Sequence, residues 1–386
     1  MNSSAFPTKQ TQQPATIVQL IPALQGGGAE TCVVQTAKAV QQAGWRSLVV
    51  SAGGGLVPEL TQSGVRHELL PAGEKTPRTL FLIPRLRQLL LSEQVRLVDV
   101  HSRVPAWLLQ LTLATLPAAN RPQVVTTVHG LNRPGIWSRV MVRGDRVIAV
   151  SEAAQRHLCA AYPDADRGRI RVIPRGVDTR LFPANYVASD AWMRSFFAEF
   201  PQAVDRRLLL FPARMSRARG QKDFLRLMAE LIQEGRNVFG LMVGDCSRHL
   251  AYVAGLREFA DQLGIGKCVA IAPQRADLRE LYAAADVVLS LPTKPESFGL
   301  VVAEALSMGR PVVAWDQGGA GDLLQKCWAA GAVPAGDRQA LMSVIRGILE
   351  GQIQAPQASC PYPLQQTLEQ TLAVYRELLE PLQSAP

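Results

Sequence analysis

Residues 295–324, PESFGLVVAEALSMGRPVVAWDQGGAGDLL, contain two glutamates, Glu296 and Glu304, separated by seven residues. Between them, the apolar run 300–303 predicts the start of a buried helix. A strand is predicted to end at Leu291 before this segment, and a second strand is predicted at 312–314, before the glycine-rich turn that follows. Strand, loop, helix and strand in this order predict one unit of a parallel, helix-covered sheet.

The spacing of the two glutamates indicates a binding site. A helix that begins near Phe298 exposes unpaired backbone N–H groups, which favour anions. At 1.5 Å rise per residue, Glu304 in the second turn would lie about 12 Å from Glu296. A nucleotide sugar fits this arrangement, because it carries hydroxyls at both ends and a diphosphate in the middle. A solvated surface role is the alternative for a helical glutamate. The neighbours of Glu304 are apolar, however, so its carboxylate requires a hydrogen-bond partner.

The same alternation of strands and helices extends over most of the chain. Apolar strand-like runs occur at residues 16–21, 47–51, 97–100, 124–128, 147–150 and 171–174, and again at 208–211, 239–243, 268–271, 287–291 and 312–314. Helix-like stretches such as 30–43 and 78–92 lie between them. Continuous Val, Ile and Leu strands separated by helices predict an α/β fold with two doubly wound, Rossmann-like parallel-sheet domains. Such domains bind ligands at the carboxyl ends of their strands, so a central cleft is expected.

Composition agrees with two domains and excludes several classes of protein. The chain has 386 residues, of which 47% are hydrophobic, enough for two cores. Its six cysteines are scattered without a C-x-x-C pair, so free thiols are expected rather than a metal or disulfide framework. No run of eighteen apolar residues predicts a membrane span. Residues 1–14 are polar and lack an apolar core, which predicts a disordered tail rather than a signal peptide.

Several motifs occur together in an order that is typical of one enzyme family. They are the Glu-x7-Glu segment, Gly26-Gly27-Gly28-Ala29-Glu30, Val128-His129-Gly130, Val147-Ile148-Ala149-Val150-Ser151, Pro174-Arg175-Gly176-Val177-Asp178 and Pro212-Ala213-Arg214. From about residue 17 to 382 the chain resembles the retaining GT-B glycosyltransferases of family 4, whose members build lipopolysaccharide, capsule and other glycans. The resemblance implies transfer of a sugar, with retention, from a nucleotide-sugar donor to a glycan or lipid-linked acceptor. It also implies a front-face mechanism, in which the leaving phosphate helps to deprotonate the acceptor.

With this resemblance the chain divides into five parts. We expect the disordered tail at 1–14, an N-terminal Rossmann-like acceptor-side domain at 15–183 and a C-terminal nucleotide-sugar domain at 207–362. An irregular linker is expected at 184–206. The last part, 363–386, is predicted to form a helix that crosses back to the first domain, as in other GT-B folds.

Cations are expected at the departing diphosphate, because sugar transfer leaves a dianion behind. Arg214 follows the strand 208–211, and Arg219 comes five residues later. The family typically has lysine where Arg219 stands; arginine keeps the charge but has a different reach and a planar, bidentate geometry. A solvated basic loop is the alternative. Gly27 and Gly28 precede a predicted helix and would allow close backbone approach to a phosphate, although a glycine turn alone is a weak signal.

Further roles come from the resemblance alone. It implies that His129 contacts the transferred sugar, that Glu296 binds hydroxyls of that sugar and that Glu304 binds the ribose. His101 and Arg103, at the end of the preceding strand, are secondary candidates for the acceptor or phosphate side. The remaining donor and nucleotide contacts are expected at Gly244, Asp245, Gln274, Arg275, Phe298, Gly299 and Leu300. Because no Asp-x-Asp stands in a loop after a predicted strand, neither a metal nor another cofactor is expected.

The formal charge of +9 suggests an anionic partner. Residues 133–180 hold ten arginines against five acidic residues, and basic side chains border an apolar face over 75–89. Such a segment can lie on an anionic membrane, although a core-facing helix with a solvated basic side is an equal alternative. No aromatic-interleaved patch or motif supports nucleic-acid binding. We expect a cytoplasmic enzyme, at the inner-membrane face. A nucleotide-sugar epimerase of the same fold and a non-catalytic carbohydrate-binding protein stay open as alternative functions.

Overall fold

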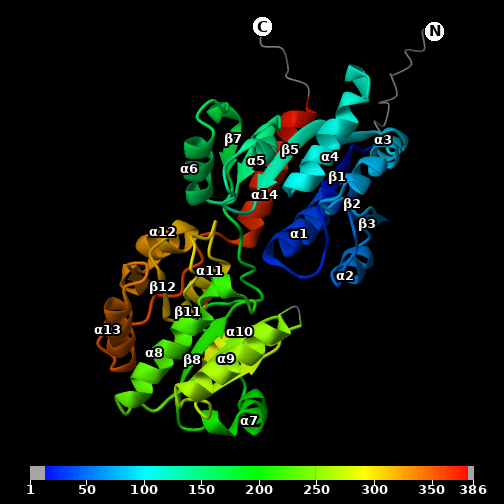
Figure 1. Ribbon diagram of the computed structural model, residues 1–386. Coiled ribbons are helices and arrows are strands. Elements are labelled where there is room, and N and C mark those ends of the chain that lie inside the picture. The colour runs from blue at the N-terminus through cyan, green and yellow to red at the C-terminus, as the bar shows by residue number, and fades with distance from the viewer. Residues whose placement is uncertain (1–13, 248, 381–386) are drawn as a thin grey trace, which may run out of the picture.

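The computed structural model describes residues 14–247 and 249–380 and consists of two α/β domains (Figure 1). The strands pair in parallel in both sheets, with the order β3-β2-β1-β4-β5-β6-β7 in the first and β10-β9-β8-β11-β12-β13 in the second. In each sheet the strand order reverses beside the first strand, between β1 and β4 and between β8 and β11. The predicted fold, two doubly wound parallel-sheet domains, is therefore confirmed.

The strands are short and mostly buried. Those of the first sheet are β1 (Thr16–Leu20), β2 (Arg46–Ser51), β3 (Arg66–Leu69), β4 (Val95–Val100), β5 (Gln123–Val128), β6 (Arg146–Ala149) and β7 (Ile170–Val172). Those of the second are β8 (Arg207–Pro212), β9 (Val238–Val243), β10 (Val269–Ala272), β11 (Val287–Ser290), β12 (Val312–Trp315) and β13 (Ala332–Val333). The sequence did not predict β3 or β13: β3 is a polar edge strand, and β13 has two residues.

Helices connect the strands and cover both faces of each sheet. In the first half of the chain they are α1 (Gly28–Gln42), α2 (Val57–Gln62), α3 (Ile83–Ser92), α4 (Arg103–Ala114), α5 (Ile136–Arg139), α6 (Glu152–Ala161) and α7 (Asp190–Glu199). In the second half they are α8 (Gln221–Gln233), α9 (Leu250–Gln262), α10 (Leu278–Ala284), α11 (Leu300–Ser307), α12 (Gly318–Cys327), α13 (Arg338–Leu349) and α14 (Leu364–Leu379). Short 3₁₀ turns include η1 (Pro77–Leu82), η3 (Val140–Val142), η5 (Pro201–Ala203) and η6 (Arg217–Arg219).

The interval 184–206 differs from the irregular linker that the sequence predicted. It contains α7 and η5, and Phe196, Phe200 and Ala203 are buried in the core of the second domain beside Phe239. The helix begins at a side-chain cap, since Ser189 accepts a hydrogen bond from the Trp192 amide. Most of this interval therefore belongs to the second domain. The predicted tail, apart from its last residue, lies outside the described residues, as does 381–386.

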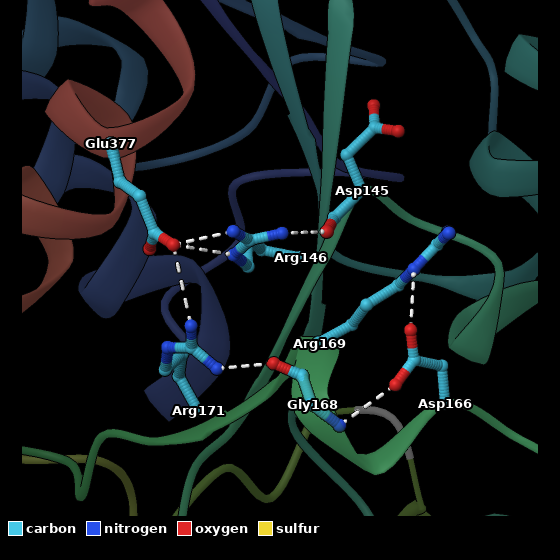
Figure 2. A network of polar contacts seen from close by, with 7 residues as sticks. All are labelled: Asp145, Arg146, Asp166, Gly168, Arg169, Arg171 and Glu377. Carbon is cyan, nitrogen blue, oxygen red and sulfur yellow. Dashed lines mark hydrogen bonds and ion pairs between the residues drawn. The ribbon is translucent and has the colours of Figure 1, made fainter. Parts of the chain in front are cut away.

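The last helix, α14, lies within the first domain, where Figure 1 shows it in red among the strands of the upper sheet. Leu372, Val374 and Tyr375 pack into the same apolar cluster as Ile17 and other first-sheet residues. Figure 2 shows a second attachment: Glu377 of α14 pairs with Arg146 of β6 and, at 3.3 Å, with Arg171 of β7. Packing and ion pairs thus hold the C-terminal helix on the N-terminal sheet.

The chain passes between the domains twice, near residue 177 and near residue 363, and these two segments contact each other. The Val177 amide donates to the Tyr362 carbonyl at 2.9 Å, and the Leu364 amide donates to the Val177 carbonyl at 2.9 Å. A side chain at Gly176 would meet the Leu364 backbone, with its Cβ 2.3 Å from the Leu364 Cα, so only glycine allows this approach. The two crossings are therefore joined by backbone hydrogen bonds at a single parallel β-bridge.

Candidate active site

The carboxyl ends of the two sheets meet across a contact between β5 of the first domain and the β11–α11 loop of the second. The Ser297 hydroxyl donates to the backbone carbonyl of His129 at 2.6 Å. In return, the Ser151 hydroxyl donates to the backbone carbonyl of Ser297. These two serines fix the loop that holds Glu296 beside His129. In a doubly wound fold this edge is where ligands bind.

Glu296 forms an ion pair with Arg219, so two residues predicted to serve different parts of a ligand contact each other. Arg219 ends η6, and Gly220 follows it with φ of +86°, a left-handed conformation that turns the chain into α8. Burial lowers the pKa of Arg219, and the charge of Arg214 lowers it further. Arg214 itself is exposed at the end of β8. The loop therefore presents two neighbouring cations, one of them shared with a carboxylate.

Glu304 is buried in the second turn of α11 and accepts a hydrogen bond from the Tyr282 hydroxyl at 2.7 Å. Burial raises the pKa of its carboxyl to about 7, and the bond from Tyr282 only partly opposes this shift. The carboxylate therefore has the partner that its apolar surroundings require. Tyr282 could not be chosen from the sequence, since it lies in a different helix, α10.

The helix α11 begins at Leu300, where the apolar run 300–303 predicted a helix start and two residues after Phe298. Gly299 precedes it with φ of +90°, and its position leaves no room for a side chain beside Ala320. The Phe298 side chain is buried in the second-domain core and packs near the Tyr362 ring. Phe298 therefore contributes packing, and Leu300, half-buried, faces the first domain near Gly28.

The glycine turn before α1 differs from the open phosphate cradle that the sequence suggested. The Gly26 and Gly27 amides donate to a Glu30 carboxylate oxygen at 2.6 and 3.0 Å. Glu30 thus occupies backbone donors that a phosphate would otherwise bind. Gly28 lies at the domain contact: a Cβ there would be 2.9 Å from Arg175 Nη1.

Arg275, predicted to contact the nucleotide, makes ion pairs within the second domain. Its guanidinium pairs with Asp277 at 2.8 Å and with Glu199 of α7 at 2.7 Å, and it lies over the Phe200 ring. These partners raise the pKa of Arg275, with Asp277 as the largest cause. Gln274 is exposed beside it. Arg275 therefore joins α7 to the second domain.

Gly244 and Asp245 follow β9 next to the Arg214 loop. A Cβ at Gly244 would lie 2.0 Å from the Ala213 carbonyl oxygen, so this glycine allows the loops after β8 and β9 to pack together. Asp245 accepts hydrogen bonds from the Ser247 amide and hydroxyl at 2.9 and 2.6 Å. Both residues shape the edge of the site.

His101 and His129 form a pair with Arg175, a residue that was quoted from the sequence only as part of a motif. His129 Nε2 lies 2.9 Å from His101 Nδ1, and Arg175 Nη2 lies 2.8 Å from His129 Nδ1. Burial, followed by Arg175, holds the pKa of His129 well below its ordinary value of 6.5. Arg103, the other secondary candidate, donates instead to the Ser138 hydroxyl at 3.2 Å. The structure thus joins His101 to His129 and leaves Arg103 at α5.

Comparison with known proteins agrees with this architecture. Residues 26–181 match the Glycosyltransferase Family 4 model, and residues 206–351 match the Glycosyl transferases group 1 model. The chain carries two glycosyltransferase family domains. The structure resembles a glycosyltransferase from Rickettsia africae with a TM-score of 0.84 and 25% identity, over 96% of this chain and 100% of that one. It also resembles Anabaena Alr3699/HepE in complex with UDP and glucose, with a TM-score of 0.80 and 23% identity over 94% and 100% of the two chains. The fold of these glycosyltransferase domains is therefore GT-B.

The curated relatives match these domains over part of their length. A D-inositol 3-phosphate glycosyltransferase from Xylanimonas cellulosilytica is 36% identical over 184 residues, which are 47% of this chain and 43% of that protein. A protein of the same name, with the number 1, from Catenulispora acidiphila is 28% identical over 258 residues, 63% of this chain and 60% of that protein. The match thus spans less than half of the first relative and less than two thirds of the second.

Proposed function

We propose that the protein is a glycosyltransferase that moves a sugar from a nucleotide-sugar donor to a glycan or lipid-linked acceptor. One observation carries the proposal: the Ser297–His129 contact brings the Glu296 loop, with Arg219, against the carboxyl edge of the first sheet. A ligand at this edge would meet cations and carboxylates from one domain and the histidine pair from the other. The similarity to D-inositol 3-phosphate glycosyltransferases supports glycosyl transfer as the reaction.

Each charged group has a role in this reaction. Arg214 and Arg219 would offset the charge that develops on the departing diphosphate. Because Arg219 pairs with Glu296, donor binding would bring sugar hydroxyls to the carboxylate and the diphosphate to the guanidinium at once. Glu304, deeper in the second domain, would accept hydrogen bonds from the ribose. The reaction would proceed with retention and without a metal. Anomeric analysis of the product, and turnover that persists in a chelator, test these two points.

Two matched variants test the assignment of the glutamates. Glu296→Gln should leave affinity for the bare nucleoside diphosphate nearly unchanged but lower turnover, because its contact requires the sugar. Glu304→Gln should weaken the nucleoside diphosphate itself by about 1.5–3 kcal/mol, the usual cost of losing a charged hydrogen-bond acceptor. Calorimetric titration with UDP, GDP and ADP measures both effects. If Glu296→Gln loses diphosphate binding while Glu304→Gln binds normally, the two roles are reversed.

Turnover assays separate the reaction from its alternatives. We expect release of nucleoside diphosphate from a nucleotide-sugar panel to depend on an added acceptor, with lipid-linked glycans and a phosphorylated inositol tested in parallel. Release of an epimer or free sugar without an acceptor would identify an epimerase. Tight binding of a sugar with no turnover on any donor would identify a carbohydrate-binding protein.

We also propose peripheral contact with an anionic membrane, at the cytoplasmic face. In the part of the chain that the structure describes, no helix is long and apolar enough to span a bilayer. The first domain nevertheless exposes large apolar side chains: Phe81 in η1 is 81% exposed and Ile136 in α5 is 83% exposed. Both segments contact α4, and Trp107 of α4 stacks on Trp137 of α5. Apolar side chains flanked by basic ones suit the surface of an anionic bilayer.

Many of the arginines considered for membrane contact already have acidic partners in the structure. Six of the ten arginines at 133–180 pair with acidic side chains, namely Arg139, Arg146, Arg156, Arg169, Arg171 and Arg180. Arg78 beside Phe81, and Arg133 before Ile136, are exposed. The protein should sediment with acidic vesicles at low salt and be released as salt screens the attraction. A Phe81→Ser, Ile136→Ser double variant should stay in solution, and equal sedimentation with neutral and acidic vesicles would contradict the proposal.

A further inference from the structure

A chain of hydrogen bonds leads from the cleft into the core of the first domain. At its outer end Arg175 Nη2 contacts His129 Nδ1, and His129 Nε2 contacts His101 Nδ1. His101 Nε2 then lies 2.5 Å from the Gln19 side-chain oxygen. His129 and Arg175 are half-buried, whereas His101 and Gln19 are buried. The outer end therefore faces the site and the rest lies beneath it.

The inner end is held by the C-terminal helix. The Gln19 side-chain amide donates to the Tyr375 hydroxyl at 2.9 Å, and this hydroxyl lies 2.5 Å from an Asp99 carboxylate oxygen. The other Asp99 oxygen accepts from the Thr127 hydroxyl at 2.8 Å. Gln19, Asp99 and Tyr375 are at most 1% exposed. We call these six residues the polar network: Arg175, His129, His101, Gln19, Tyr375 and Asp99.

The two ends of the polar network fix which group donates and which accepts in each of its hydrogen bonds. Arg175 can only donate, so His129 Nδ1 must accept and His129 Nε2 must carry the proton. His129 then donates to His101 Nδ1, and His101 Nε2–H donates to the Gln19 oxygen. An ionised Asp99 can only accept, which requires Tyr375 to donate to it and the Gln19 amide nitrogen to donate to Tyr375. Both ends impose the same order.

This arrangement can orient groups but cannot pass protons along its whole length. The Gln19 amide would have to give up an N–H proton to transmit one, so it interrupts any proton path between His101 and Tyr375. Burial, opposed in part by Asp99, lowers the pKa of His101, and burial lowers that of His129, which keeps both imidazoles neutral. The consequence is a fixed tautomer of His129, whose unprotonated Nδ1 accepts from the Arg175 guanidinium.

We propose that Asp99, Tyr375, Gln19 and His101 are positioning residues that hold His129 in the tautomer whose Nδ1 accepts from Arg175, and that His129 in this way places the Arg175 guanidinium to donate to a substrate hydroxyl. With one guanidinium nitrogen held by His129, the remaining N–H groups of Arg175 can donate to a sugar hydroxyl. A residue that orients a histidine commonly fixes its tautomer in this way. The inference deepens the proposed transfer reaction and rests on it, although the tautomer itself is a property of the unliganded protein.

Imidazole ¹⁵N spectra of the protein test the tautomer directly. The chain has five histidines, and His101→Asn and His129→Asn variants assign two of them. At pH 7 we expect His101 and His129 each to show a protonated Nε2 and an unprotonated Nδ1. A proton on His129 Nδ1 in the wild-type spectrum would overturn the proposal without any assay of activity, whatever sugar or acceptor the enzyme uses.

A matched pair of variants tests the role of the inner end. Tyr375→Phe and Thr127→Val each remove one hydroxyl that donates to Asp99, but only Tyr375 lies between Asp99 and His129. Tyr375→Phe frees the Gln19 amide to turn its nitrogen toward His101, which favours the opposite tautomer of both histidines against the Arg175 contact. We therefore expect a mixture of His129 tautomers and a kcat lowered about fivefold to tenfold, the effect of one lost hydrogen bond. Thr127→Val should keep the wild-type His129 spectrum and kcat. Equal effects of the two variants would mean a general loss of packing and would refute the positioning role. Absence of turnover in the wild type would instead refute the proposed reaction, with the spectra still decisive.

Discussion

Replacing Glu304 by glutamine should change how the stability of the second domain depends on pH. The buried carboxyl has a pKa of about 7 in the folded protein, against an ordinary 4.5. The folded state therefore holds this proton more tightly than the unfolded chain does. The stabilisation that results is fully present below about pH 4.5 and is lost as the pH rises through 7. At 1.36 kcal/mol per pKa unit, the total loss is about 3 kcal/mol.

Glutamine has nearly the same shape, can still accept from the Tyr282 hydroxyl and does not ionise. Urea unfolding of the wild type and of Glu304→Gln should be measured at pH 5 and at pH 8. On going from pH 5 to pH 8, the wild type should lose about 2–3 kcal/mol more unfolding free energy than the variant. All other titrating groups are common to both proteins and cancel in this comparison. Glu258→Gln, on the exposed side of α9, is the control and should show no such change.

A stability difference between wild type and Glu304→Gln that is the same at pH 5 and pH 8 would refute the reasoning. It would mean that Glu304 titrates as an ordinary glutamate despite its burial. Tyr282→Phe offers an independent check, because the Tyr282 hydroxyl lowers the pKa of Glu304. Without that hydroxyl the protein should lose still more stability on going from pH 5 to pH 8.

Substitutions at three further positions follow from the structure. Arg219→Lys should retain most activity, while Arg219→Ala should lower kcat about a hundredfold, the usual effect of removing a preorganised charge at a leaving group; full activity of the alanine variant would assign this role to Arg214. Gly220→Ala should lower the free energy of unfolding, measured in urea, by at least about 2 kcal/mol, because φ is +86° and its Cβ would lie 1.8 Å from the Leu291 carbonyl oxygen. A variant as stable as the wild type would show that the turn relaxes. Glu377→Gln should lower the free energy of unfolding by less than about 1 kcal/mol, since its side chain is 40% exposed. A larger loss would mean that the ion pairs of Glu377 with Arg146 and Arg171 are a main attachment of α14.

The fold could be predicted from the sequence because its strands are continuous apolar runs separated by helical stretches. Two strands do not follow this pattern and were not predicted. β3 is a polar edge strand, RHEL, and β13 pairs through only two residues. Helix α7 was missed because most of its residues are at least partly exposed and it has one fully buried side chain, Phe196.

The candidate site was predicted in part. Glu296, Arg219 and His129 were chosen by the family resemblance together with their places after strands, which a parallel sheet brings to one edge. Sequence position does not give the direction of a side chain, and the pairing of Arg275 with Glu199, a residue 76 positions earlier, could not be predicted. The partner of Gln19 lies 356 positions away, so no local pattern could have identified it. A glutamine inside the apolar strand TIVQL was the one available signal.

The position of α14 makes the first domain discontinuous in sequence, with the whole second domain inserted between β7 and this helix. During synthesis the first sheet emerges long before the helix that covers Gln19 and Asp99. The part of that sheet that α14 covers therefore stays exposed while the second domain is made, and an incompletely covered sheet is prone to aggregate. The N-terminal domain can finish folding only after α14 has been made, so a truncation before residue 364 would leave two buried polar side chains without their partner rather than remove a dispensable tail.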